Sequence, residues 1–379
     1  MKNKELVFGL SAMVVVFIVL FVYSNINQTD SIEKEGVIKI GWIGPLTGYG
    51  AVWGEISKNT AELVVNDINS NGGIDGRELE IIYEDGKCNG KEAVSAVQKL
   101  IDVDSVKIIF VSCSQEVFPV APITEKNKVI LFGTYSTNKD ISNLGDYVFR
   151  NAYSDSDIAE IAFETISKDH KSIGIISELN DYAIGIRDDL NNRFEEVGIE
   201  VNRENFVTGS TEFKSQVINI LDKDPDAVLV NPSSLLAGIT ILKELTEFGF
   251  EGQVYGNFFG SSNEVQNSLY SDGMIYFADP TVSESIIKKE LFERYKDRYG
   301  EYPDLEFPIA TQHDSLYILK QAIEECRGAD TDCIRDYLYD LESFTGALGT
   351  YSFDENGDLE GIKPSVNIIR DGDGILYEE

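Results

Sequence analysis

The fold is decided by residues 37–76, which read VIKIGWIGPLTGYGAVWGEISKNTAELVVNDINSNGGIDG. The stretch begins with a β-rich, mostly apolar run at 37–43, as expected for a parallel strand that helices cover on both faces. A helix follows, because core-type side chains recur every four residues from Ile56 to Ile68 and share one face. The chain therefore starts as a strand followed by an amphipathic helix.

The same alternation of strand and helix continues along the chain. Further short β-rich runs are expected at residues 79–83, 108–111, 129–132, 172–176, 227–230 and 253–255, with helical stripes between them. The last third predicts helices at residues 284–299, 306–326 and 331–342, and strands at 349–353 and 364–369. This order favours right-handed crossovers and an α/β fold of doubly wound parallel sheets.

Length and charge limit the classes of function. With 379 residues, the chain is long enough for two domains. It holds 32 Lys and Arg against 65 Asp and Glu, a formal net charge of −33. A surface this acidic repels phosphate backbones and anionic lipid headgroups, so nucleic-acid binding is not expected. The charge fits a soluble, self-repelling surface in a salty external medium.

The first 36 residues form a separate segment. Lys2 and Lys4 precede an uncharged apolar run at residues 6–23, which as a helix spans about 27 Å, close to one hydrocarbon core. The run is longer than a usual secretory h-region, and no A-x-A-like cleavage site follows it. An uncleaved membrane anchor is therefore favoured over a cleaved signal peptide. Either one places residues 30–379 outside the cytoplasm, where Asn27 begins an N-x-T glycosylation sequon.

The four cysteines agree with export. They are Cys88, Cys113, Cys326 and Cys333, and four cysteines allow three pairings. Disulfides persist outside the cell, and the economical pairing joins Cys88 to Cys113 and Cys326 to Cys333. Free buried thiols are the alternative. A zinc site is not expected, because no C-x-x-C occurs and the chain has two histidines.

Signatures of catalysis and of cofactors are missing. The glycines at residues 44–54 do not have the dinucleotide-binding spacing, and neither a P-loop nor a G-x-S-x-G motif occurs. His170 lies in a charged loop, and His313 is typical of a packed histidine on a helix. The acidic stretch at 354–358 fits a turn rather than a calcium loop. The chain is therefore not expected to be an enzyme or to bind a metal or cofactor.

The residues that end the predicted strands suggest where a ligand binds. Several runs stop at small or polar residues, namely Ser112, Gly133, Ser177, Asn231 and Asn257. Ligands of open parallel sheets bind beyond the carboxyl ends of the strands. These ends form two series, one before residue 150 and one after residue 170. Two sheets that face each other across a cleft would bring both series to one ligand.

Several motifs resemble those of the branched-chain amino acid binding proteins. They are GWIGPLTG at residues 41–48, WG at 53–54 and NDINSNGGIDG at 66–76. Cys88, after EDG, and Cys113, before a serine, resemble the disulfide pair of that family. The resemblance extends over about residues 37–370. It implies an extracytoplasmic solute-binding protein with the type I periplasmic-binding fold, which serves an ABC importer.

The resemblance also implies two lobes joined by three crossing segments, expected at residues 150–153, 276–280 and 345–349. One lobe would comprise residues 37–151 and 280–345, and the other residues 152–279 and 346–379. The folded part is expected to be a monomer whose partners are a small-molecule ligand and an ABC permease, with no nucleic acid. The alternative is a membrane-tethered sensory ectodomain that acts with a separate signalling partner.

Site residues follow by the same resemblance. The expected ligand-binding residues are Tyr49, Trp53, Ser114, Ser136, Thr137, Tyr182, Ser233 and Phe258. Tyr49 and Trp53 would wall the apolar part of the ligand, and Tyr182 would close over it from the second lobe. Ser114 opens a helix and suits a carboxylate or carbonyl, since helix N-termini attract negative charge. Ser136 and Thr137 would offer N–H, carbonyl and hydroxyl groups.

Two positions depart from the family pattern. Phe258 stands where the family places an acid for the ligand's ammonium group, and Ser233 or Ser234 stands where it offers an aromatic ring. A buried ammonium without a carboxylate is costly. An α-amino acid would therefore need a substitute acid, for which the candidates are Glu178, Asp181, Glu264 and Asp279. The competing ligands are a neutral amide or urea-like compound, or a carboxylate without the amine.

Overall fold

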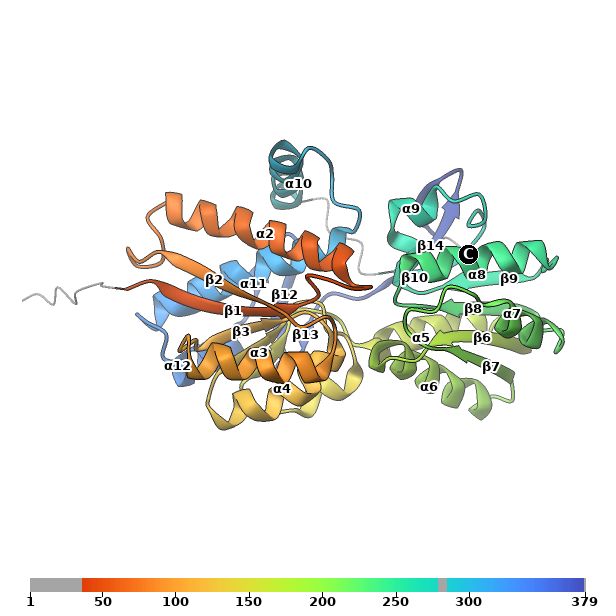
Figure 1. Ribbon diagram of the computed structural model, residues 1–379, viewed down its shortest axis with the longest axis horizontal. Helices are drawn as coiled ribbons and strands as arrows, with labels where there is room; N and C mark the ends of the chain where they lie inside the picture. The colour runs from red at the N-terminus through yellow and green to blue at the C-terminus, as the bar shows by residue number, and fades with distance from the viewer. Residues whose placement is uncertain (1–35, 279–284, 378–379) are drawn as a thin grey trace, which may run out of the picture.

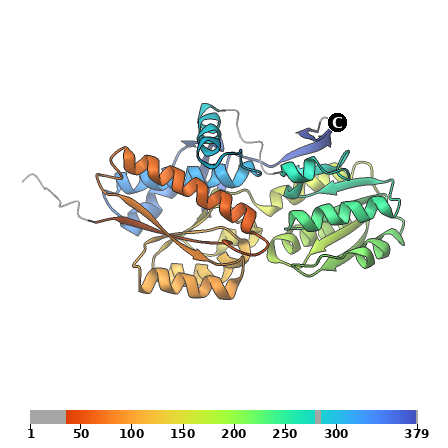
Figure 2. The same ribbon diagram turned by 45° about the horizontal axis from the view of Figure 1, so that its top comes forward.

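The chain folds into two α/β lobes that lie end to end, as Figures 1 and 2 show. A computed structural model describes residues 36–278 and 285–377. The predicted anchor at residues 6–23 lies outside this part of the chain. Within the described residues, no helix is both long and apolar enough to cross a membrane.

The first lobe is built on a five-stranded parallel sheet in the order β2-β1-β3-β4-β5. The strands are β1 (Ile38–Gly44), β2 (Leu79–Asp85), β3 (Ile108–Val111), β4 (Ile130–Gly133) and β5 (Val148–Arg150). The helices are α2 (Ala51–Ser70), α3 (Gly90–Asp102), α4 (Ser114–Lys126), α10 (Ile286–Tyr299), α11 (Glu306–Glu325) and α12 (Thr331–Tyr339), with a short 3₁₀ turn at Lys139–Asn143. Helices α2 and α11 pack together on one face of the sheet, and α3 and α4 on the other (Figure 1).

The second lobe has a seven-stranded sheet in the order β15-β14-β10-β9-β8-β6-β7. Its strands are β6 (Ser172–Glu178), β7 (Glu200–Phe206), β8 (Ala227–Asn231), β9 (Gln253–Gly256), β10 (Ile275–Ala278), β14 (Ser365–Arg370) and β15 (Asp373–Leu376). Its helices are α5 (Asp155–Ile166), α6 (Asp181–Glu196), α7 (Lys214–Leu221), α8 (Leu235–Glu247) and α9 (Asn263–Gln266), with a 3₁₀ turn at Phe258–Ser261.

The second sheet is mixed rather than parallel, which corrects the predicted fold in this detail. Strand β14 runs antiparallel to β10, and β15 runs antiparallel to β14. The two added strands form a hairpin, whose turn places Asp371 and Gly372 at positive φ. A hairpin reverses chain direction within a few residues, whereas a parallel pair needs a long crossover. The short turn therefore accounts for the antiparallel pairing of β15 with β14.

All seven strands predicted from the β-rich runs are present, with ends that agree within two residues. Strands β5, β7 and β10 were not predicted. Strand β7 has the sequence EVNRENF, lies at an edge of the sheet, and buries only its last side chain, that of Phe206. Strand β5 has only three residues. A short or polar strand lacks the apolar run from which buried strands are recognised.

The third crossing lies later in the chain than expected. Residues 345–349 connect β11 (Phe344–Thr345) to β12 (Thr350–Phe353), and these pair with β13 (Leu359–Glu360) in a small sheet. The ring of Phe353 packs on Phe132 and Phe149 of the first lobe. The chain therefore crosses to the second lobe between β13 and β14.

The structure contains both expected disulfides. Cys88 pairs with Cys113 and fastens the loop after β2 to the start of α4. Cys326 pairs with Cys333 and joins the end of α11 to α12. The first pair lies beside the lobe interface, so it fixes a loop that borders the site described below.

Two buried charged side chains tie separate segments of the first lobe together. The guanidinium of Arg150 is fully buried, bonds the carboxylate of Asp358, and donates to the carbonyls of Thr137 and Asn138. The carboxylate of Asp314 in α11 is also fully buried and accepts two backbone N–H groups from the loop between β11 and β12. Both contacts join segments far apart in the sequence.

Candidate functional site

A cavity lies between the lobes, at the carboxyl ends of strands from both sheets. Its atom-free space is about 480 Å³, counted out to the open mouth. Its lining consists of Tyr49, Trp53, Cys88, Ser112, Cys113, Ser114, Gln115, Tyr135, Thr137, Tyr153, Asn180, Tyr182, Ser233 and Phe258. Both lobes contribute, so a bound molecule would touch each of them.

The structure brings together seven of the eight residues expected in the site. They are Tyr49, Trp53, Ser114, Thr137, Tyr182, Ser233 and Phe258. It does not bring Ser136 to the cavity: this side chain is fully buried, and its hydroxyl donates to the carbonyl of Val111 at 3.2 Å. The hydroxyl of Ser136 therefore ties the loop after β4 to β3 and does not face the cavity.

The first lobe offers a polar corner built around Ser114. Its Oγ accepts the N–H groups of Thr137 and Asn138, both at 3.1 Å. A hydroxyl has two accepting positions and one hydrogen, so the hydrogen of Ser114 remains available to an acceptor. Ser114 also begins α4, where the helix dipole favours negative charge. This corner suits a carboxylate or a carbonyl oxygen.

A second hydroxyl group in the cavity points to the same chemistry. Tyr49 accepts a hydrogen bond from the side-chain amide of Gln115 at 2.7 Å, which leaves its own hydrogen to donate. Burial, and next the negative charge of Glu178, raise the pKa of Tyr49 above its usual value. Tyr49 therefore stays neutral and can act as a donor at any physiological pH.

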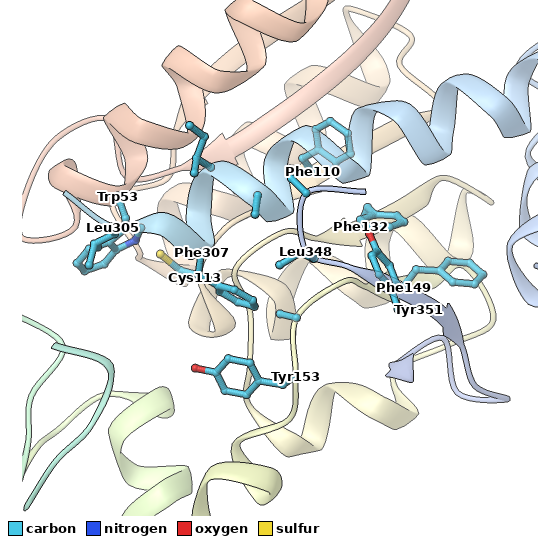
Figure 3. Close-up of a cluster of buried hydrophobic side chains, with 14 of the residues drawn as sticks. Trp53, Phe110, Cys113, Phe132, Phe149, Tyr153, Leu305, Phe307, Leu348 and Tyr351 are labelled. Atoms are coloured by element: carbon cyan, nitrogen blue, oxygen red, sulfur yellow. The ribbon is translucent and has the colours of Figure 1, made fainter. Parts of the chain in front are cut away.

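Aromatic rings enclose the rest of the cavity. The ring of Phe258, from the second lobe, stands edge-on to Trp53 and Tyr135 of the first lobe, with centroid distances of 6.3 and 6.1 Å. Tyr182 meets Phe258 at 5.5 Å. Figure 3 shows Trp53 and Cys113 in the buried cluster of the first lobe, with Tyr153 on the segment that leads to the second. These rings create an apolar chamber beside the polar corner.

The second lobe contributes a short chain of polar groups. The side chain of Asn180 donates to the hydroxyl of Ser233 at 2.8 Å. The backbone N–H of Ser233 donates to one carboxylate oxygen of Glu178 at 2.7 Å. Asn180 and Ser233 line the cavity, and the fully buried Glu178 lies behind them.

Direct hydrogen bonds hold the two lobes together in this structure. Asn138 of the first lobe donates to the carbonyl of Asp181 of the second at 2.7 Å. Further along the interface, Asp304 accepts the hydroxyl of Ser262 and the N–H of Asn263. The lobes are therefore in contact around the cavity.

Several lining residues were missed from sequence. Ser112 was noted as a strand end but not as a site residue, and its buried hydroxyl has no hydrogen-bond partner among the described residues. Tyr135 and Asn180 lie within three residues of β4 and β6. Their positions just beyond strand ends were the signal that could have identified them.

Asp155, the first residue of α5, gives the folded chain a pH dependence. It is fully buried, and burial raises the pKa of its carboxyl to about 7, although the hydroxyl of Thr137 and the charge of Arg150 oppose the shift. Between about pH 4 and 7 the folded chain keeps a proton that the unfolded chain has lost, so stability falls as pH rises through this range. Above the pKa of Asp155 in the folded chain, this contribution to stability is fully lost.

Replacing Asp155 by asparagine should remove this dependence. Urea unfolding at pH 4.5 and 7.5 is expected to show a smaller stability difference in Asp155→Asn than in the unaltered chain, by about 3 kcal/mol. Glu160→Gln, at an exposed position of the same helix, is the control and should leave the difference unchanged. The same pH slope in the unaltered chain and in Asp155→Asn would show that Asp155 titrates normally.

Two lobes that enclose a cavity with polar and aromatic walls define a solute-binding protein. The chain belongs to the periplasmic binding protein family, whose family model matches residues 37–363. Proteins of this kind work outside the cytoplasm and deliver small solutes to ABC importers, and this chain is such a solute-binding protein.

Known proteins similar to the chain agree with this assignment. A leucine-, isoleucine-, valine-, threonine- and alanine-binding protein from Pseudomonas aeruginosa is 24% identical over 336 residues, 87% of this chain and 89% of the relative. The crystal structure of a leucine binding protein from Thermotoga maritima is 26% identical, with a TM-score of 0.80 over 90% of this chain and 98% of the other. A benzoate-bound solute-binding protein of an ABC transporter from R. palustris shares the fold, with a TM-score of 0.81 and 16% identity over 90% and 96%.

Proposed function

We propose that the chain binds a small solute with a carboxylate and a compact apolar body, the chemistry of aliphatic amino acids and of the matching amine-free acids. The observation that carries this proposal is the Ser114 hydroxyl, whose hydrogen remains available at the N-terminus of α4, beside the aromatic chamber. The carboxylate would accept from Ser114 and Tyr49, and the apolar body would lie among Trp53, Tyr182 and Phe258.

The names of the similar proteins support both ligand types. The Pseudomonas aeruginosa relative is named for aliphatic amino acids and threonine, whereas the R. palustris structure holds benzoate, a carboxylate without an amine. The cavity here also suits one carboxylate beside an apolar group. Whether the ligand also carries an amine depends on the polar groups that the second lobe brings to the cavity.

We further propose how the chain is held and delivers its solute. The uncharged run at residues 6–23 would anchor it on the outer face of the membrane as a monomer. The two lobes would open and close on the solute, since ligands at a hinge shift an equilibrium between open and closed forms.

Calorimetric titration tests the proposed ligand class. L-leucine, L-isoleucine, L-valine, 4-methylpentanoate and isobutyramide should be titrated into the purified chain at pH 7. At least one of the carboxylates is expected to bind saturably and more tightly than the neutral amide. Tighter binding of isobutyramide than of every carboxylate would contradict the proposal, as would the absence of binding by all five compounds.

Removing the Ser114 hydroxyl should weaken that binding. Ser114→Ala is expected to cost about 1–3 kcal/mol of binding free energy, because the ligand loses a donor and two buried N–H groups lose their acceptor. Ser95→Ala, at an exposed position in α3, is the matched control and should keep the original affinity. Equal affinity in Ser114→Ala and Ser95→Ala would show that the ligand's carboxylate does not bind at Ser114.

A further inference from the structure

The side chain of Glu178, at the end of β6, is incompletely satisfied. It is fully buried, and one of its oxygens accepts the backbone N–H of Ser233 at 2.7 Å. The other oxygen, Oε1, is buried without a hydrogen-bond partner in the described part of the chain. No Lys, Arg or His forms an ion pair with it among the ion pairs found there. A buried carboxylate in this state is costly unless a cation joins it.

The position of Glu178 points to the cavity as the source of that cation. Ser233, which bonds it, and Asn180, two residues along the chain, both line the cavity. The charge of Glu178 also acts on the hydroxyl of Tyr49, which lines the cavity from the first lobe. The carboxylate is therefore near groups on both sides of the cleft.

Other acids near the second lobe do not offer the same arrangement. Asp181 and Glu264 are exposed to solvent, where water already satisfies a carboxylate, and Asp279 lies outside the described residues. Phe258 stands in the cavity where the family resemblance expects an acid, and its ring packs against Trp53, so it offers the ligand no charge. Among the candidates within the described residues, Glu178 is the buried one.

We infer that Glu178 receives the ammonium group of an α-amino acid, so that the chain selects amino acids over the matching amine-free acids although Phe258 occupies the usual acidic position. The inference rests on the proposed function, which places the ligand carboxylate at Ser114. An ammonium group carries three donors, one of which would bond Oε1 of Glu178. The two charged ends of the ligand would thus be held by different lobes, and binding would draw the lobes together.

Two probes that differ only in the amine test the inference. L-leucine and 4-methylpentanoate should be titrated at pH 7 into the unaltered chain, Glu178→Gln and the exposed control Glu160→Gln. The unaltered chain is expected to bind L-leucine at least tenfold more tightly than 4-methylpentanoate. Glu178→Gln should lose at least tenfold of its affinity for L-leucine and change its affinity for 4-methylpentanoate less than threefold, while Glu160→Gln matches the unaltered chain.

The failing outcomes separate the inference from the proposed function. Binding of 4-methylpentanoate as tight as that of L-leucine would overturn the role of Glu178 and leave the proposed carboxylate site standing. Full affinity of Glu178→Gln for L-leucine would lead to the same conclusion. No binding of either probe, or of the other carboxylates, would overturn both statements. If Glu178→Gln does not fold, the affinities of the unaltered chain for L-leucine and 4-methylpentanoate still test whether the chain selects the amine.

Discussion

Replacing Arg150 by methionine is expected to lower the free energy of unfolding by about 3–4 kcal/mol. The guanidinium is fully buried and makes a two-point contact with the carboxylate of Asp358. It also supplies the donor for the carbonyls of Thr137 and Asn138. Methionine fills similar space but leaves these buried carbonyls without a donor, and their desolvation is then uncompensated.

The same change should weaken solute binding, because Arg150 positions the loop whose N–H groups hold Ser114. Urea denaturation measures the stability, and calorimetry with the tightest-binding probe measures the affinity. Arg150→Lys keeps the charge but not the two-point geometry, so it should lose an intermediate amount of stability. Equal stability of the unaltered chain and Arg150→Met would show that these carbonyls find other donors.

Replacing Asp314 by alanine is the second change with a large expected effect, about 3 kcal/mol of unfolding free energy. The fully buried carboxylate accepts the N–H groups of Ala347 and Leu348 at 2.7 and 2.9 Å. The substitution removes both acceptors at once. The loop between β11 and β12 would then have two unsatisfied N–H groups in the interior.

Gly346 provides an independent test of the same contact. A Cβ at this position would lie 2.3 Å from the carboxylate of Asp314, so the carboxylate and the loop can approach only because the residue is glycine. Gly346→Ala should therefore destabilise the chain by pushing the two apart, whereas Glu342→Gln, at an exposed position nearby, should not. Unfolding by urea compares the four chains. Unchanged stability in both Asp314→Ala and Gly346→Ala would show that this contact contributes little.

The fold was largely predictable because most of its strands are buried on both faces. Strand β3, for example, has four apolar residues that are all fully enclosed. The polar edge strand β7 lacked this signal. The position of the third crossing also could not be predicted, because it depends on the packing of Phe353 against rings more than two hundred residues earlier in the chain.

The candidate site was predictable in its location but not in the direction of each side chain. Residues after strand ends were expected to gather, and most of them line one cavity. Ser136 and Thr137 are neighbours in sequence, yet Ser136 turns back to β3 while Thr137 faces the cavity. Glu178 was only one of four candidate acids. Its burial and its unpartnered oxygen follow from the packing of β6 against its neighbours, which sequence does not give.

Binding of a solute between the lobes is tested most directly by a crystal structure of the chain grown with L-leucine. The expected result is density for one leucine in the cavity, with its carboxylate at the Ser114 hydroxyl, its ammonium group at Glu178 and its side chain against Trp53 and Phe258. A structure with the lobes closed, the cavity filled by protein rings and leucine absent or bound elsewhere would contradict it.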